Sequence, residues 1–394
     1  MPRYNGGFIG TDGLDAPDPP TNVTPTAGNA QVSVAFTAPT DTGTSAITGF
    51  VAQVSTDGTN YSAGSNTGSS SPIVVSSLTN GTSYTAKVWA INAYGTSAPS
   101  EASTGVSPAL PPARALFAGD TSLINNVVYL DVATLGNAAD FGDLTYVVYG
   151  GGMTGNSTTS VVGGGYTSGY NSTNIMCSRV FATTGNYADF GDLTNSVGNG
   201  LSSCSSSTRG IYAGGSLTNG TRQNTIQYIT IASASNATDF GDLAAARDNN
   251  QGGMSNGTRG ICAYAGYGPP SLNSIEYITI ASTGNASDFG DAQQTSFIYG
   301  CSSNSTRGIA GRATTIDYIT IASTGNASDF GDLDPSRGDC TSASSSLRTV
   351  FTGSGSADTD YITIASLGNS SDFGTLPQKM QQSSALCQDH GGAS

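Results

Sequence analysis

The segment YITIASTGNASDFGD occupies residues 277–291 and occurs again, unchanged, at residues 318–332. Looser copies of its Asp-Phe-Gly part bring the total to six, and successive aspartates are 49, 50, 49, 41 and 43 residues apart. The six pairs are Asp140 and Phe141, Asp189 and Phe190, Asp239 and Phe240, Asp288 and Phe289, Asp329 and Phe330, and Asp372 and Phe373. A repeat of about 40 to 50 residues is typical of a propeller or a solenoid.

Each copy is expected to contain four short strands. Eleven residues before the aspartate stands a tyrosine in five copies (Tyr129, Tyr228, Tyr277, Tyr318 and Tyr361), with Ser178 in the second copy. Farther upstream, a segment of the TRGIYAGG type carries an arginine (Arg114, Arg209, Arg259, Arg307 and Arg348), which Thr159 replaces in the second copy. Alternate residues of YITIAS face opposite sides, as in a strand, and no unit has a convincing helical period. The array therefore predicts a six-bladed β-propeller, with each arginine bracing the turn of its own blade.

The two ends of the array complement each other. The first unit begins at ARALFAGD (113–120), the equivalent of TRGIYAGG, and so lacks a first strand. The last Asp-Phe-Gly is followed by a spare first strand, SALCQDHGGAS (384–394). We expect Leu386 and Cys387 to pair with the segment that contains Arg114 and Leu116, which closes the ring and leaves no exposed edge. Alignment of Cys387 with Cys301 sets the expected register.

The N-terminal part alternates with a period of two residues and turns every 8 to 12 residues, as in VSVAF (32–36), which is typical of an antiparallel sandwich. Residues 16–107 resemble a fibronectin type III domain, through Pro19-Pro20, PTDTGTSAITGF (39–50), LTNGTSY (78–84) and KVWAINAYGTSAPS (87–100). The resemblance implies that the Tyr84 hydroxyl bonds back to the backbone. Phe36 stands where the family commonly has Trp, and no RGD sequence is present to imply integrin binding.

The whole chain is thus expected to be all-β and to have four parts. Residues 1–15 are rich in Gly, Asp and Asn without a period, and we interpret them as a docking arm held by another copy or by a partner. Residues 16–107 form the sandwich, residues 108–112 a stiff Pro-rich linker, and residues 113–394 the propeller.

Composition excludes several partners. The net charge is −14 and only 10% of residues are charged, so nucleic acid gains no counterion release on binding. No apolar run reaches the roughly 18 residues of a membrane span, and MPRYNGGFIG lacks the pattern of a secretory signal.

We expect the six cysteines to be free and buried, because none forms a C-x-x-C pair. One common position in four first strands is expected to hold a cysteine: Cys204, Cys301, Cys340 and Cys387. Another repeat has Gly253 there, so we interpret these residues as small side chains that line a crowded channel.

The Asp-Phe-Gly triplet resembles a kinase metal motif, but a strand Lys, a Gly-rich loop and a His-Arg-Asp loop are missing. Five copies continue to a second acid (Asp143, Asp192, Asp242, Asp291 and Asp332), which offers too few oxygens for Ca²⁺. We therefore expect a structural turn, in which Asp caps backbone N–H groups, Phe fills the space between blades and Gly takes a positive φ. No metal and no cofactor are predicted.

The sequence disfavours two enzyme classes. Sialidases have six-bladed propellers, but their Asp box reads Ser-x-Asp-x-Gly-x-x-Trp, and the only Trp of this chain, Trp89, lies outside the array. A serine hydrolase would need His390, the only histidine, which no G-x-S-x-G elbow accompanies. We expect His390 to be a solvated turn residue and predict no catalytic residues.

The repeat array, residues 113–394, resembles proteins associated with virions of marine tailed bacteriophages, through YITIASTGNASDFGDL and TRGIYAGG. It is also similar to kelch-type propellers, through the strand that ends in Gly214-Gly215. The resemblance implies a non-enzymatic structural or decoration protein, made in the host cytoplasm and exposed on the virion surface. Its expected partners are other virion proteins, further copies of itself and a host-surface glycan. A carbohydrate-binding adhesin and a glycan-degrading propeller enzyme stay as alternatives.

Overall fold

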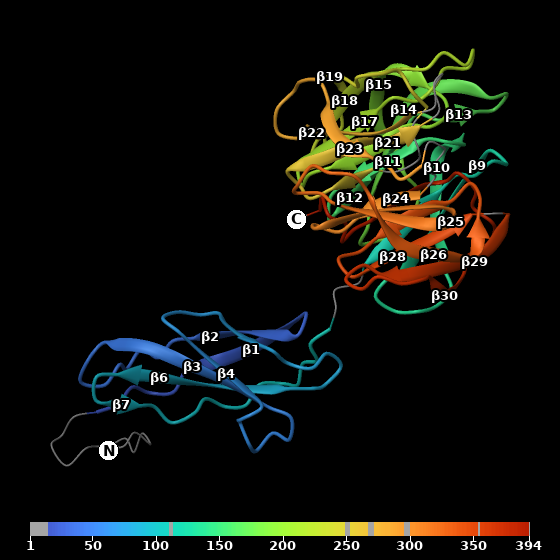
Figure 1. The fold of residues 1–394 in the computed structure, drawn as a ribbon. Coiled ribbons are helices and arrows are strands. Elements are labelled where there is room, and N and C mark those ends of the chain that lie inside the picture. Colours follow the sequence, from blue (N-terminus) through green and yellow to red (C-terminus); the bar gives the residue numbers. More distant parts are fainter. Residues whose placement is uncertain are drawn as a thin grey trace. The chain divides into compact units, whose positions relative to one another are not determined.

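The structure is a computed structural model that describes residues 15–109, 113–248, 253–266, 272–294, 300–353 and 355–393. All regular secondary structure within these ranges is β, which confirms the predicted all-β class. No helix of the described residues is long and apolar enough to cross a membrane. The chain divides into two compact units, Met1–Pro111 and Pro112–Ser394 (Figure 1). Apart from Asp15, the expected docking arm lies outside the described residues, as do residues 110–112 of the expected linker.

The first unit is a sandwich of two antiparallel sheets. One sheet has the order β1 (Thr21–Gly28), β2 (Gln31–Thr37), β5 (Ile73–Ser76), and the other has the order β4 (Gly64–Gly68), β3 (Ile47–Ser55), β6 (Thr85–Asn92), β7 (Gly95–Thr96). Alternate residues of β2, β3 and β6 point into the core between them, where Phe36 packs on Phe50 with ring centroids 4.8 Å apart. The backbone N–H of Thr79 donates to the Tyr84 hydroxyl at 3.1 Å, which is the backbone contact that the resemblance implied.

The second unit consists of six antiparallel sheets, named here the first to the sixth sheet after the repeat unit that supplies most of their strands (Figure 1). The first is β10 (Ala139–Val148), β9 (Ile124–Asp131), β8 (Arg114–Ala118), β31 (Ser384–Cys387), and the second is β11 (Gly152–Gly155), β12 (Thr159–Gly163), β14 (Asn171–Val180), β15 (Ala188–Val197). The third is β16 (Ser202–Ser205), β17 (Arg209–Ala213), β18 (Thr225–Thr230), β19 (Thr238–Asp242), and the fourth is β20 (Met254–Ser255), β21 (Arg259–Gly266), β22 (Leu272–Thr279), β23 (Ser287–Asp291). The fifth is β24 (Gly300–Ser303), β25 (Arg307–Thr320), β26 (Ser328–Arg337), and the sixth is β27 (Thr341–Ser344), β28 (Arg348–Gly353), β29 (Ser356–Thr363), β30 (Ser371–Thr375).

Two sheets depart from the expected four strands. In the fifth sheet, β25 covers both the second and the third expected strand, because only a short bend at Ala313 (φ 46°) separates them and no Gly-rich loop intervenes. In the second sheet, an additional short strand, β13 (Tyr166–Thr167), pairs with the start of β14. The second repeat is the most divergent one in the sequence. A comparable hairpin in the third repeat has only an isolated bridge between Ser216 and Arg222.

The last strand, β31, pairs antiparallel with β8, so the first sheet contains strands from both ends of the repeat array. The register differs from the expected one. Cys387 lies opposite Ala115, whereas alignment with Cys301, which lies opposite Ala310, would place it opposite Phe117. The correction is a shift of two residues. Because two residues are one full strand period, each side chain of β31 keeps its face, so the hydrophobic pattern could not distinguish the two registers.

The six sheets contact one another in a cyclic order. Among their first strands, β31 contacts β11, and the contacts continue through β16, β20, β24 and β27 back to β31. Each of six apolar clusters draws its residues mainly from two neighbouring sheets, including one cluster between the sixth sheet and the first. The phenylalanine of every Asp-Phe-Gly triplet belongs to one of these clusters and is at most 4% exposed. The core of the second unit is therefore divided among the junctions between sheets.

Candidate functional site

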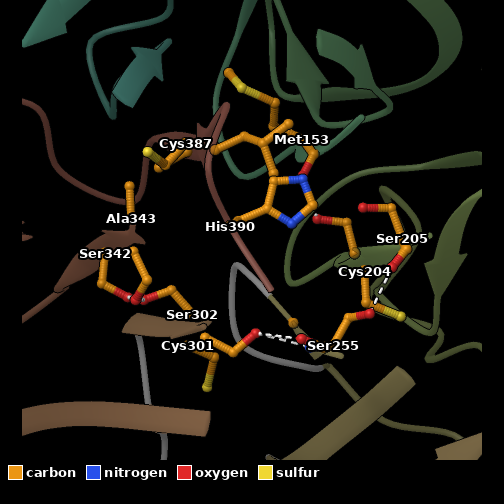
Figure 2. Close-up of a pocket in the computed structure, with 16 residues that line it drawn as sticks. Met153, Cys204, Ser205, Ser255, Cys301, Ser302, Ser342, Ala343, Cys387 and His390 are labelled. Carbon is orange, nitrogen blue, oxygen red and sulfur yellow. Dashed lines mark hydrogen bonds between the residues drawn. The ribbon is translucent and has the colours of Figure 1, made fainter. Parts of the chain in front are cut away.

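The first strands and the segment after β31 surround a cavity of about 30 Å³ (Figure 2). Its walls are mostly small side chains: Ser203, Cys204, Ser205, Gly253, Ser255, Cys301, Ser302, Ser303, Ser342, Ala343, Ser344, Ala385 and Cys387. Met153, Leu386 and His390 are the larger residues of the lining. This volume admits about one or two water molecules, and it is too small for a sugar ring or a nucleotide.

Serine hydroxyls link neighbouring first strands around this cavity. The Ser302 hydroxyl lies 2.9 Å from the Ser342 hydroxyl and 2.7 Å from the Ser344 hydroxyl, all three buried. On the other side, the Ser303 hydroxyl donates to the Ser255 carbonyl at 2.9 Å. Small side chains allow these strands to approach closely, and their hydroxyls satisfy polar atoms that the approach buries.

The segment after β31 crosses the ends of three first strands. The Gly391 N–H donates to the Ser303 carbonyl at 2.9 Å. A Cβ atom on Gly391 would lie 2.0 Å from the Ser255 carbonyl oxygen, and one on Gly392 would lie 2.1 Å from the Ser205 carbonyl oxygen. Because these contacts involve backbone oxygens, only glycine fits at either position.

His390 lies in a turn, as predicted, but it is half-buried and its ring faces the cavity, so the prediction of a solvated residue holds only in part. Figure 2 shows its ring in the middle of the cavity residues. Its Nδ1 atom accepts a hydrogen bond from the Gly392 N–H at 3.0 Å, and its Nε2 atom is buried without a hydrogen-bond partner in the described structure. Burial lowers the pKa of His390 from 6.5 to about 4, against the smaller opposing effects of the Gly155 backbone and Asp389. The imidazole is therefore neutral at pH 7.

The cysteines of the first strands also need a correction. All four thiols are buried and free, but they do not share one position. Cys204 lies opposite Ile211 in its hairpin, Cys301 opposite Ala310 and Cys387 opposite Ala115, while Cys340 precedes its strand.

Burial also determines the chemistry of these thiols. It raises the pKa of Cys204 and of Cys340 to about 12, and it raises the pKa of Cys301 and of Cys387 further. A nucleophilic cysteine needs a lowered pKa and a positive neighbour. Neutral thiols around a neutral imidazole provide a packed centre, and this arrangement gives no activated nucleophile.

The recurring tyrosine, phenylalanine and arginine form one repeated stack. In the fourth sheet, the Tyr277 and Phe289 rings meet edge to face with centroids 6.0 Å apart, and the Arg259 guanidinium lies 4.3 Å from the centre of the Tyr277 ring. The Tyr–Phe contact recurs at 5.9 to 6.0 Å in the first, third, fifth and sixth sheets. An aromatic face attracts a guanidinium, so each stack holds its arginine in place.

We expected each arginine to brace the turn of its own blade. The structure corrects this expectation, because the arginines also bond to the neighbouring sheet. Arg259 stacks on its own sheet but donates to the Ile321 carbonyl of the next sheet at 2.9 Å. The other four reach neighbouring sheets in the same way: Arg114 to Phe181, Arg209 to Ile280 and Ala281, Arg307 to Ile364, and Arg348 to Val132 and Ala133. The arginine therefore joins two sheets, and it joins the sixth to the first.

The glycine of each triplet makes a second junction with the next sheet. A Cβ on Gly241 (φ 149°) would lie 2.4 Å from the Gly284 carbonyl oxygen. The Gly284 N–H donates to the Phe240 carbonyl at 2.8 Å, and the Asp242 N–H donates to the Asn285 Oδ1 atom at 3.0 Å. The same amide cap, at 3.0 to 3.1 Å, comes from Asn137, Asn186, Asn236, Asn326 and Asn369, so every sheet is bonded to the next.

These bonds correct the role expected for the aspartates. The cap on the backbone comes from an asparagine of the neighbouring unit, while the triplet aspartates, Asp140, Asp189, Asp239, Asp288, Asp329 and Asp372, are exposed. Asparagine is the better cap here because a neutral amide satisfies the N–H without placing another carboxylate beside the aspartates. The described residues contain no group of three or more His, Cys, Asp or Glu side chains that could hold a metal ion.

Two buried ion pairs were not foreseen. Arg247 pairs with Glu276, and Arg337 pairs with Asp360, and all four side chains are at most 4% exposed. Glu276 and Asp360 stand immediately before the recurring tyrosines, at a position that holds Gln227 and Asp317 in two other units. The sequence signal for these ion pairs was a polar residue just before the recurring tyrosine, at a position that faces the core. Arg247 follows β19 and Arg337 is the last residue of β26, so each pair attaches the end of one sheet to the following sheet.

The family-model comparison concerns the first compact unit. A family model of the fibronectin type III domain matches residues 18–106, so this part of the chain is a fibronectin type III domain, as the sequence predicted. Domains A168–A170 of titin share 28% identity over 24% of this chain, with a TM-score of 0.23. The match spans 33% of that titin chain. No curated protein matches.

Proposed function

We propose that residues 113–394 form a six-bladed β-propeller, loosely similar to kelch propellers, in which β31 supplies the first strand of the first blade. The cyclic contacts among first strands support this architecture, as do the asparagine caps that run from every sheet to the next. In a closed ring the innermost strands are covered on both sides by neighbours, and only short outer edges remain. The pairing of β31 with β8 then acts as the clasp of the ring.

We further propose that the protein is a non-enzymatic structural or decoration protein of a bacteriophage virion. The observation that carries the structural role is that the repeated residues are used to join sheets: Phe fills the junctions, and Gly, Asn and Arg bond across them. The virion context is supported by the resemblance of the repeats, and by a surface that is poor in charge and has only two lysines. On this proposal the arm and the sandwich dock the molecule, in several copies, and the propeller is displayed outward.

The location is tested by immunogold electron microscopy of particles that carry an epitope-tagged full chain. Label at a regular site on intact particles is expected, and a variant that lacks residues 1–15 should be incorporated much less efficiently. Absence of label from purified particles would refute the virion role, whereas normal incorporation of the shortened chain would refute the docking arm alone.

A glycan-degrading enzyme is the alternative that predicts a different chemical result. The purified full chain, incubated with polysaccharide of the host surface, is expected to release no reducing sugar. Release of reducing ends above that of a heat-inactivated sample would replace the structural proposal with an enzymatic one.

A further inference from the structure

Three tyrosines form a cluster in the second compact unit: Tyr149 precedes β11, Tyr166 begins β13, and Tyr170 lies in the turn between β13 and β14. The rings of Tyr149, Tyr166 and Tyr170 lie with centroids 5.9, 6.2 and 6.1 Å apart in the three pairings, so each ring contacts the other two. Tyr149 and Tyr166 are partly exposed and bond to each other through their backbones, and Tyr170 is 54% exposed. We call these three residues the tyrosine cluster.

Among the described residues, three tyrosine rings meet in this way only in the second repeat. The tyrosine cluster lies on the hairpin of β13 and β14. The third repeat has a comparable hairpin, with an isolated bridge between Ser216 and Arg222, but no tyrosine stands on it. Features that recur in every repeat explain the assembly of the sheets, whereas a feature found once among the described residues marks a single place. The sequence signal was available as YTSGY (166–170) in the divergent unit.

The conformation of Tyr170 costs stability. Its φ of 57° is left-handed, a region that Gly and Asn occupy easily and that bulky residues seldom adopt. A glycine or an asparagine at the end of this short loop would fold with less strain, yet an aromatic ring stands there, exposed. Such strain is concentrated at functional sites.

The groups next to the tyrosine cluster are neutral and form hydrogen bonds. The Ser172 hydroxyl lies 2.8 Å from that of Thr218, the Asn171 side chain donates to the Ser168 carbonyl at 3.0 Å, and the Tyr166 hydroxyl donates to the Leu217 carbonyl at 3.4 Å. No Asp, Glu, Lys or Arg occurs in residues 166–172. Aromatic faces flanked by hydroxyls and amides are complementary to a ligand that has both C–H faces and hydroxyl groups.

We propose that the tyrosine cluster is a binding platform for a neutral saccharide. The polarised C–H groups of a pyranose lie against the electron-rich face of Tyr170, and its hydroxyls exchange hydrogen bonds with the neighbouring Ser, Thr and Asn side chains. The net charge of −14 disfavours anionic ligands such as nucleotides or acidic glycans. A platform centred on one exposed ring is also small against the roughly 800 Å² per partner of a stable protein interface. The biological meaning of this site, contact with a host surface, rests on the proposed outward display of the propeller.

The test uses the full chain on an array of immobilised neutral hexose and N-acetylhexosamine oligosaccharides, followed by titration of the best binder in solution. Binding is expected, and Tyr170→Ala should weaken it at least tenfold. Tyr170→Asn should weaken it equally while its unfolding midpoint stays equal to or above that of the unaltered chain, because Asn tolerates the left-handed backbone. Tyr94→Ala is the matched control, since Tyr94 is 50% exposed in the first unit.

Three outcomes would overturn the inference: no binding to any neutral saccharide at millimolar concentration, binding that Tyr170→Ala leaves unchanged, or binding only to acidic glycans. Capture of another virion protein that Tyr170→Ala abolishes, without saccharide binding, would show that the platform serves protein docking instead. None of these outcomes changes the labelling of particles by which the virion role is tested, so the two proposals fail separately.

Discussion

Replacement of Ala115 by cysteine should produce a disulfide with Cys387. The two residues lie opposite each other in the β8–β31 pair, and the Gln388 N–H donates to the Arg114 carbonyl at 2.9 Å. In antiparallel strands, hydrogen-bonded and non-hydrogen-bonded pairs alternate, so Ala115 and Cys387 form a non-hydrogen-bonded pair, with Cα atoms about 4.5 Å apart. This separation is within the range of disulfides.

The stabilisation expected from this bond is large. The crosslink closes a loop that includes nearly all of the second unit, for which loss of chain entropy in the unfolded state corresponds to about 5 kcal/mol, less any strain in the folded state. Because burial raises the pKa of the Cys387 thiol, little thiolate exists in the folded protein, and the oxidant should be added during refolding. Peptide mass spectrometry identifies the linked residues, and denaturant unfolding of the oxidised and the reduced protein gives the difference in stability.

Two further variants decide which part of the reasoning fails. Cys387→Ser combined with Ala115→Cys must lose the crosslink. Phe117→Cys places a thiol where the register expected from the sequence would put it, opposite Cys387. A disulfide from Phe117→Cys but not from Ala115→Cys would restore that register, and no disulfide from either would refute the pairing of the two strands.

Three other variants test the remaining interactions. Phe289→Ala removes a ring that is 2% exposed at a junction between sheets and should lower the free energy of unfolding by about 3 to 5 kcal/mol in a denaturant titration; Asp288→Ala, next to it and exposed, should stay within about 0.5 kcal/mol. Arg307→Lys keeps the charge but loses the planar stack on its tyrosine and the bond to the next sheet, so a loss of about 1 to 2 kcal/mol is expected, and an unchanged thermal midpoint would contradict this. For His390, burial holds the pKa at about 4, below that of the unfolded chain, so the unfolded chain binds more protons between pH 4 and 6.5. Stability should therefore fall as the pH drops through this window, by up to about 3 kcal/mol, and H390Q should abolish most of that pH dependence.

Much of the architecture was predictable because it depends on local rules. Alternation in VSVAF and in YITIAS places apolar side chains on one face of a strand whatever surrounds it, and the all-β class and the fibronectin type III domain followed from such patterns. The sequence showed Tyr at a fixed distance from Phe in five repeats but did not predict their contact, which the structure shows in all five. The location of the chain and its partners stay predictions.

The sequence by itself determined which segments become strands, how they repeat, and that β31 has a place to fill, because periodicity and repeat length are properties of the chain alone. Only the tertiary structure decided the register of β31, the burial of His390, the asparagine caps between units and the meeting of three tyrosines. A shift of two residues preserves every side-chain face, so local pattern cannot select a register; the close fit of Gly391 and Gly392 against backbone oxygens can. The capping asparagines do recur, three residues before each triplet aspartate, but their partners in the neighbouring repeat are identified only once the sheets have come together.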